Sequence, residues 1–131
     1  MIVDAGVAVK WLIDEDGSAE ALLLLEGSAL QAPDLLFAEV ANVIWKRWRR
    51  GEFTQLPIGL YTLPRMFGTV DSLATLLPRA VALAVELDHP AYDCCYLAMA
   101  LERDDVLVTA DAKFLRICTA SRYAGNVRSL T

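Results

Sequence analysis

The stretch Val106-Leu107-Val108-Thr109-Ala110-Asp111 decides the fold, because residues that favour a buried strand are followed at once by residues that end it. The chain opens in the same way, with Met1-Ile2-Val3 followed by Asp4. Short apolar runs without polar alternation are typical of strands that helices cover on both faces, as in a parallel sheet. We therefore expect an α/β protein with acidic residues directly after its interior strands.

Strand-like runs alternate with helical periodicity along the 131 residues, the pattern of one α/β domain spanning residues 1–131 with a mainly parallel sheet. Ser18 is expected to cap the second helix, and Gly51 to end the third. The expected strands are 1–3, 30–32, 68–70, 106–109 and 127–130, and the expected helices are 7–13, 18–25, 34–50, a short one within 54–66, 73–87, 91–103 and 112–118.

The composition indicates a compact globular protein, since 56% of the residues are hydrophobic and 22% are charged. No apolar stretch is long enough to span a bilayer, and the first residues lack a signal-like pattern, so we expect a cytoplasmic protein. Cys94, Cys95 and Cys118 form no metal-binding pattern and are expected to be buried thiols. The net charge of −5 argues against a general nucleic-acid binder.

Acidic residues stand where the folding pattern favours apolar or neutral ones. Ligands of open parallel sheets bind at the carboxyl ends of the strands, where Asp4 and Asp111 are expected to lie. Asp93 follows Pro90 in the first turn of a helix and should lie near the same edge. Taken alone, Asp93 is an ordinary acid at a helix start and Asp111 an ordinary helix cap.

Glu39 interrupts an otherwise apolar helix. Its polar neighbours Asn42 and Lys46 follow at i+3 and i+7 and share one helical stripe with it. Most of the rest of the helix is apolar, so we expect it to be largely buried, with Glu39 and Asn42 facing an internal polar pocket. The alternative is a solvated polar stripe.

A cluster of carboxylates requires compensation, because two like charges ~4 Å apart repel by ~4 kcal/mol at an effective dielectric constant of ~20. Oxygen ligands alone favour hard cations, so we expect Mg²⁺, with Mn²⁺ as an alternative. His89 is the only histidine and cannot supply a paired acid and base. The sequence also lacks a GxSxG motif and a P-loop. Hydrolysis by a metal-bound water is the chemistry that remains.

Several motifs together resemble PIN-domain proteins of the VapC toxin type, and the resemblance covers essentially the whole chain. They are Val3-Asp4-Ala5-Gly6 with Val9-Lys10-Trp11, Ala32-Pro33-Asp34-Leu35 with Glu39-Val40-Ala41-Asn42, His89-Pro90-Ala91-Tyr92-Asp93 with Tyr96-Leu97-Ala98, and Leu107-Val108-Thr109-Ala110-Asp111 with Phe114.

The resemblance implies a three-layer α/β/α sandwich and a Mg²⁺- or Mn²⁺-dependent endoribonuclease. It further implies the toxin of a type II toxin–antitoxin pair, a homodimer and a VapB-like antitoxin partner. By position, Asp4, Glu39, Asp93 and Asp111 match the family's acidic metal-binding residues, with the ion held chiefly by Asp4 and Asp93. Asn42 and Thr109 match its supporting polar positions, and Gly6 replaces the Ser that is common there.

Five basic residues are candidate contacts for RNA phosphate or for the antitoxin. They are Lys10, Lys46, Arg47, Arg49 and Arg50. The alternative for the last four is a solvated helix end that complements the helix dipole.

Other functions stay open on sequence grounds. A Mg²⁺-binding phosphoacceptor signalling domain would also be small, acidic and α/β, with Asp71 as its candidate acceptor. A non-catalytic interaction module, and a nuclease that acts on DNA or matures RNA, are the further alternatives.

Overall fold

The computed structural model describes residues 1–27 and 29–131. Its centre is a five-stranded sheet in the order β3-β2-β1-β4-β5, in which every neighbouring pair is parallel. The strands are β1 (Ile2–Val3), β2 (Leu30–Pro33), β3 (Phe67–Asp71), β4 (Leu107–Thr109) and β5 (Val127–Ser129).

The strand order reverses at β1. The chain first builds outward from β1 through β2 to β3, and then returns to place β4 and β5 on the other side of β1. Val3 and Val108 are partners in the register of β1 and β4, so the two strands end within one residue of each other. In open α/β sheets the crevice at such a switch point is where ligands bind.

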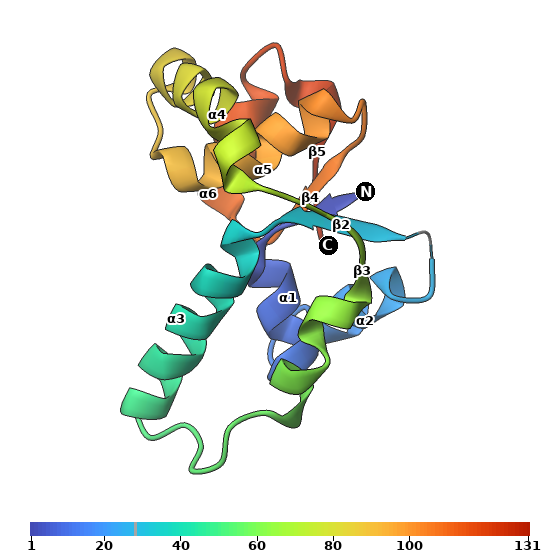
Figure 1. The fold of residues 1–131 in the computed structure, drawn as a ribbon, viewed down its shortest axis with the longest axis vertical. Helices are drawn as coiled ribbons and strands as arrows, with labels where there is room; N and C mark the ends of the chain where they lie inside the picture. The colour runs from blue at the N-terminus through green and yellow to red at the C-terminus, as the bar shows by residue number, and fades with distance from the viewer. Residues whose placement is uncertain (28) are drawn as a thin grey trace.

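Helices cover both faces of the sheet. On one face lie α1 (Ala5–Leu12), α2 (Ser18–Leu24) and α3 (Leu35–Arg49), and on the other α4 (Leu73–Leu87), α5 (Ala91–Glu102) and α6 (Ala112–Thr119) (Figure 1). Three 3₁₀ turns complete the fold: η1 (Ile58–Tyr61), η2 (Leu63–Met66) and η3 (Ala124–Asn126). The predicted three-layer α/β/α sandwich with a parallel sheet is confirmed.

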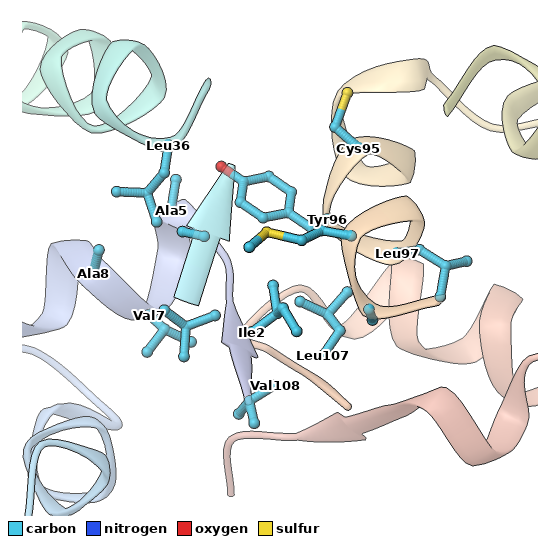
Figure 2. Close-up of a cluster of buried hydrophobic side chains, with 14 of the residues drawn as sticks. Ile2, Ala5, Val7, Ala8, Leu36, Cys95, Tyr96, Leu97, Leu107 and Val108 are labelled. Atoms are coloured by element: carbon cyan, nitrogen blue, oxygen red, sulfur yellow. The ribbon is translucent and has the colours of Figure 1, made fainter. Parts of the chain in front are cut away.

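The core is centred on α5, which is buried continuously from residue 94 to residue 100. Tyr96 and Leu97 pack with Ile2 of β1 and Leu107 of β4 (Figure 2). A helix that is apolar on all sides belongs inside a protein, and α5 lies between the sheet and α4. This burial fixes the position of Asp93 in the first turn of the same helix.

Local boundaries differ from the sequence prediction where glycine or proline directs the backbone. Ser18 does not cap α2: Gly17 takes that position at φ +89°, and the Ser18 hydroxyl donates to the carbonyl of Ile13. The helix expected within 54–66 is replaced by the 3₁₀ turns η1 and η2, which begin beside Pro57 and Pro64. Gly51 ends α3 at φ +79°, as predicted.

The expectation that most of α3 is buried is wrong. Only Leu36, Val40 and Ile44 are buried, a narrow stripe in steps of four residues. Trp45 and Trp48 remain 47% and 50% exposed. The prediction failed because α3 carries apolar residues on more than one side, whereas only one side of the helix packs against the rest of the protein.

Two further sequence predictions concern the environment of the chain. All three cysteines are buried and free, as expected. Among the described residues, no helix combines the length and the apolar character needed to cross a membrane. The cytoplasmic location stays a prediction.

Candidate active site

One cleft gathers the acidic residues that the sequence singled out. It has a volume of ≈ 380 Å³ and lies at the carboxyl ends of β1 and β4, and we call it the acid pocket. Its charged lining consists of Asp4, Glu15, Glu39, Asp93 and Asp111 with the basic residues Lys10 and Arg47. Residues far apart in the sequence thus meet at the switch point of the sheet.

Asp4 is the most buried acid of the pocket, with 7% of its surface exposed. Its Oδ1 accepts the Val7 N–H at 3.0 Å and so caps α1, while its Oδ2 accepts the Thr109 hydroxyl and the Ala110 N–H. Desolvation raises the pKa of Asp4 to about 6, and the charge of Asp93 adds to this against the opposing hydrogen bonds. Asp4 therefore holds its negative charge at a cost that a nearby cation would relieve.

Glu39 reaches the pocket from α3 and is half-buried. The buried Tyr96 hydroxyl donates to its Oε1 at 2.5 Å, and Figure 2 shows the Tyr96 ring extending from α5 toward α3. Desolvation raises the pKa of Glu39, the Tyr96 hydrogen bond opposes this, and the charge of Asp93 adds to it. In the sequence, Tyr96 stands out only as part of a motif. Its hydrogen bond to Glu39 joins α5 to α3, two helices on opposite faces of the sheet, and no local pattern predicts such a contact.

Asp93 is held by the one histidine. The His89 Nε2 lies 2.7 Å from the Asp93 Oδ2, one helical turn away, and the imidazole is buried against the ring of Phe114. Burial and this contact agree with a structural histidine that orients the carboxylate.

Asp111 has two roles in the structure. Its Oδ1 accepts the N–H groups of Lys113 and Phe114, so it caps α6. The same side chain is exposed and lines the acid pocket. The alternative of a helix cap is therefore correct for Asp111, and the residue lines the acid pocket as well.

The two supporting positions have different environments. Thr109 is buried, and its hydroxyl donates to Asp4 while it accepts the Asp111 N–H, so it links two acids of the pocket. Asn42 is exposed and does not line the acid pocket, but it shares a second, open depression with Glu39 and Tyr92. Glu39 and Asn42 therefore lie side by side as predicted, whereas only Glu39 reaches the acid pocket.

The helical stripe that faces the pocket runs in steps of four. Glu39 is followed there by Val43 and Arg47, whereas Asn42 and Lys46 turn outward and are exposed. The row i, i+4, i+8 and the row i, i+3, i+7 are both compatible with one helix face, and only the packing of α3 against α1 selects between them.

The five candidate cations separate into two groups. Lys10 and Arg47 line the acid pocket. The guanidinium of Arg49 lies over the Trp45 ring at 5.4 Å, and Arg50 lies 3.8 Å from Glu52. Lys46, Arg49 and Arg50 are exposed and do not line the pocket.

The donor set suits a hard cation. Within residues 1–27 and 29–131, no three Asp, Glu, His or Cys side chains converge closely enough to form a ready cage for an ion. Mg²⁺ does not need one, because it keeps several waters and is usually bound through one or two carboxylates. The raised pKa values of Asp4 and Glu39 indicate carboxylates whose charge the protein leaves incompletely compensated.

Asp71, the candidate phosphoacceptor, does not belong to this pocket. It ends the edge strand β3, and its carboxylate accepts two hydrogen bonds from Arg103 at 2.8 and 2.5 Å. An acceptor aspartate must be free and beside the metal site, so the structure gives the signalling alternative no support.

Comparison with known proteins links this chain to one family. The model of the PIN domain matches residues 1–120. Ribonuclease VapC3 of Pyrobaculum aerophilum is 32% identical over 116 residues, which are 85% of this chain and 88% of that protein. Ribonuclease VapC1 of Mycobacterium tuberculosis is 32% identical over 117 residues, 86% of each chain.

Solved structures agree at the level of the fold. A toxin–antitoxin complex from Klebsiella pneumoniae contains a chain that superposes with a TM-score of 0.69 at 18% identity, covering 99% of this chain and 97% of that one. PAE2754 from Pyrobaculum aerophilum gives a TM-score of 0.66 at 22% identity, covering 98% and 82%.

Proposed function

Because the chain belongs to the PIN-domain family and resembles its VapC ribonucleases over most of its length, we propose that it is an endoribonuclease, the toxin of a type II toxin–antitoxin pair. The observation that carries this proposal is the acid pocket, where Asp4, Glu39, Asp93 and Asp111 line one cleft. The substrate is the phosphodiester backbone of RNA.

The proposed cofactor is Mg²⁺, with Mn²⁺ as an alternative. Asp4 and Asp93 would hold it chiefly, with Glu39 and Asp111 as direct or water-mediated ligands. When bound, the ion supplies positive charge for a phosphoryl oxygen and lowers the pKa of a water. The raised pKa values of Asp4 and Glu39 support this role, because an added cation favours their charged forms.

The side chains around the acids have defined tasks in this proposal. Thr109 and Ala110 hold one oxygen of Asp4 in place, and His89 holds Asp93. Of Glu39 and Asp111, Glu39 is the better candidate to accept a proton from the attacking water. Its raised pKa brings it closer to neutral pH, and the Tyr96 hydroxyl fixes its position.

The chemistry is tested by the RNA ends. Hydrolysis by water leaves a 5′-phosphate and a 3′-hydroxyl, so end-sequencing of RNA after induction should find these ends with the unsubstituted protein. Asp4→Asn and Asp93→Asn should abolish cleavage while the circular dichroism spectrum is retained. Products with 2′,3′-cyclic phosphate would instead indicate attack by the ribose and would refute the proposed mechanism.

We further propose a VapB-like antitoxin and a second copy of the chain as protein partners. Two exposed apolar surfaces support this, since such surfaces are typical of interaction sites. The first is a groove of ≈ 530 Å³ between α3 and η1, on the helix that also carries Glu39 and Arg47, and we assign it to the antitoxin. The second is a stripe on α4 in steps of four residues, which we assign to the second copy: Leu77, Val81 and Val85.

A further inference from the structure

We propose that Lys10 and Arg47, braced by Glu15, form a binding site for a backbone phosphate of the RNA in the wall of the acid pocket. The inference rests on the proposed ribonuclease function and names the part of the site that binds the charged substrate. It separates two functional cations from the other basic residues of the chain, and it gives a role to Glu15.

The pocket needs cations on electrostatic grounds. Five carboxylates line it, and each phosphate of the substrate adds a further negative charge. In the part of the chain that the structure describes, Lys10 and Arg47 are its basic lining residues. A divalent ion compensates the acids, and a separate pair of cations is required to attract the RNA chain itself.

Glu15 holds both cations. Its Oε1 lies 3.2 Å from the Lys10 Nζ, and its Oε2 lies 2.6 Å from the Arg47 Nη2. The three side chains are only 17–22% exposed, so they are partly withdrawn from water and interact more strongly than surface ions. Desolvation acts to raise the pKa of Glu15, but Arg47 and Lys10 outweigh it and lower the pKa.

The loop between α1 and α2 is shaped around Lys10. The Lys10 ammonium donates to the Asp16 carbonyl at 2.6 Å, and the Glu15 N–H donates to the buried Ser18 hydroxyl at 2.9 Å. A Cβ at Gly17 would lie 3.2 Å from the Lys10 Cε, closer than most real contacts. Because these contacts come from separate parts of the loop, the folded loop fixes the position of the Lys10 side chain.

Both cations keep donors for a ligand. Among the described residues, the Lys10 Nζ donates to two acceptors, Glu15 and Asp16, which leaves one ammonium N–H for a ligand. Arg47 makes one short contact, to Glu15, and a long one of 3.9 Å to Glu52. A guanidinium offers further N–H groups in a fork that fits a phosphate. The brace therefore positions the two cations without exhausting their hydrogen bonds.

The test compares cations inside and outside the pocket. Lys10→Met and Arg47→Met remove charges from the proposed site, and Lys46→Met and Arg50→Met are matched controls on exposed cations. Binding of a fluorescent single-stranded RNA is followed by anisotropy in Ca²⁺ buffer from about 50 to about 300 mM KCl. Each pocket variant should weaken binding about tenfold at low salt and reduce the slope of log affinity against log salt by about 0.7, whereas the controls should leave the slope unchanged.

The brace is tested through kinetics. Glu15→Ala frees both cations, so the KM for RNA should rise several-fold with little change in kcat, because Glu15 acts by positioning. Glu52→Ala is the control, since Glu52 contacts Arg47 only at 3.9 Å. Tighter RNA binding by Glu15→Ala would identify Glu15 as a competitor of the phosphate and would overturn its role as a brace.

The outcomes separate this inference from the proposed function. The unsubstituted protein can bind and cleave RNA while Lys10→Met and Arg47→Met show an unchanged salt slope. That result overturns the phosphate site and does not affect the proposed ribonuclease function. If those variants lose only antitoxin affinity, the pair belongs to the partner surface and the inference is also overturned. Failure of the unsubstituted protein to bind or cleave RNA refutes the proposed function itself.

Discussion

Tyr96→Phe isolates one hydrogen bond of the site without altering its packing. The Tyr96 side chain is 1% exposed, and phenylalanine keeps its ring within the core, so no cavity arises. What is lost is the bond of 2.5 Å to Glu39. A hydrogen bond to a charged group contributes about 1.5–3 kcal/mol, and because Glu39 is only half-buried, water replaces part of it. We expect a loss of about 1–2 kcal/mol in the free energy of unfolding.

Urea unfolding at pH 7.5 in EDTA measures this loss, and thermal unfolding should show a fall of roughly 4 °C per kcal/mol. Tyr92→Phe is the control: Tyr92 is 65% exposed, so its substitution should change stability by less than about 0.5 kcal/mol. The double variant with Glu39→Ala should lose less than the sum of the single variants, because both single changes remove the same bond.

Activity gives a second measurement of the same bond. The Tyr96 hydrogen bond lowers the pKa of Glu39 against desolvation, so its removal should raise that pKa further. The acid limb of the kcat/KM profile of Tyr96→Phe should then move to higher pH. The reasoning is refuted if Tyr96→Phe is as stable as Tyr92→Phe and the pH profile does not move.

Three further predictions follow from individual contacts. Carboxyl ¹³C NMR in EDTA should show Asp4 titrating near pH 6. Because the native state then binds more protons than the unfolded chain, the contribution of Asp4 to the stability of the metal-free fold should fall as pH rises from about 4 to about 6. Saturating Mg²⁺ should lower this pKa, and an unshifted pKa would contradict metal binding at Asp4. Gly6→Ser should lower the free energy of unfolding in urea by up to about 1 kcal/mol, because the serine Cβ would lie 3.2 Å from the Ala110 Cβ. Adding Ala110→Gly should restore the lost stability, and a failure to do so would exclude this contact as the cause. Val81→Glu should convert a dimer into a monomer in light scattering while Ala82→Glu does not, and equal masses for both variants would remove the α4 stripe from the dimer interface.

The sequence was most informative where a side chain follows directly from its strand. Asp4 and Asp111 come after runs of apolar residues, and the parallel register of β1 and β4 brings them to one edge. Nothing beyond strand periodicity and the rule for sheet edges was needed to expect this. The same rule predicted the position of Asp93, because α5 begins at that edge of the sheet and Asp93 lies in its first turn.

The sequence was least informative where a contact depends on how helices rotate against each other. From the sequence, Asn42 and Arg47 are equally plausible partners of Glu39 in the acid pocket. The packing of α3 turns Arg47 into that pocket and leaves Asn42 in an exposed depression that Glu39 also lines. Glu15 lies in a loop between two helices, and its contact with Arg47 spans 32 residues of sequence. No periodicity signals such a pair.

The dual role of Asp4 has a consequence for how inactive forms of the protein arise. Its Oδ1 caps helix α1 while its Oδ2 lies in the acid pocket with Thr109 and Ala110, so a change to alanine removes a helix cap together with the proposed catalytic carboxylate. Asparagine keeps an oxygen for the cap and removes the charge, while its NH₂ group replaces the Oδ2 that accepts from Thr109 and Ala110. Lineages that lose toxicity at this position are therefore expected to retain Asn, Ser or Thr there, and a laboratory stock of silenced protein is best made with the same substitution.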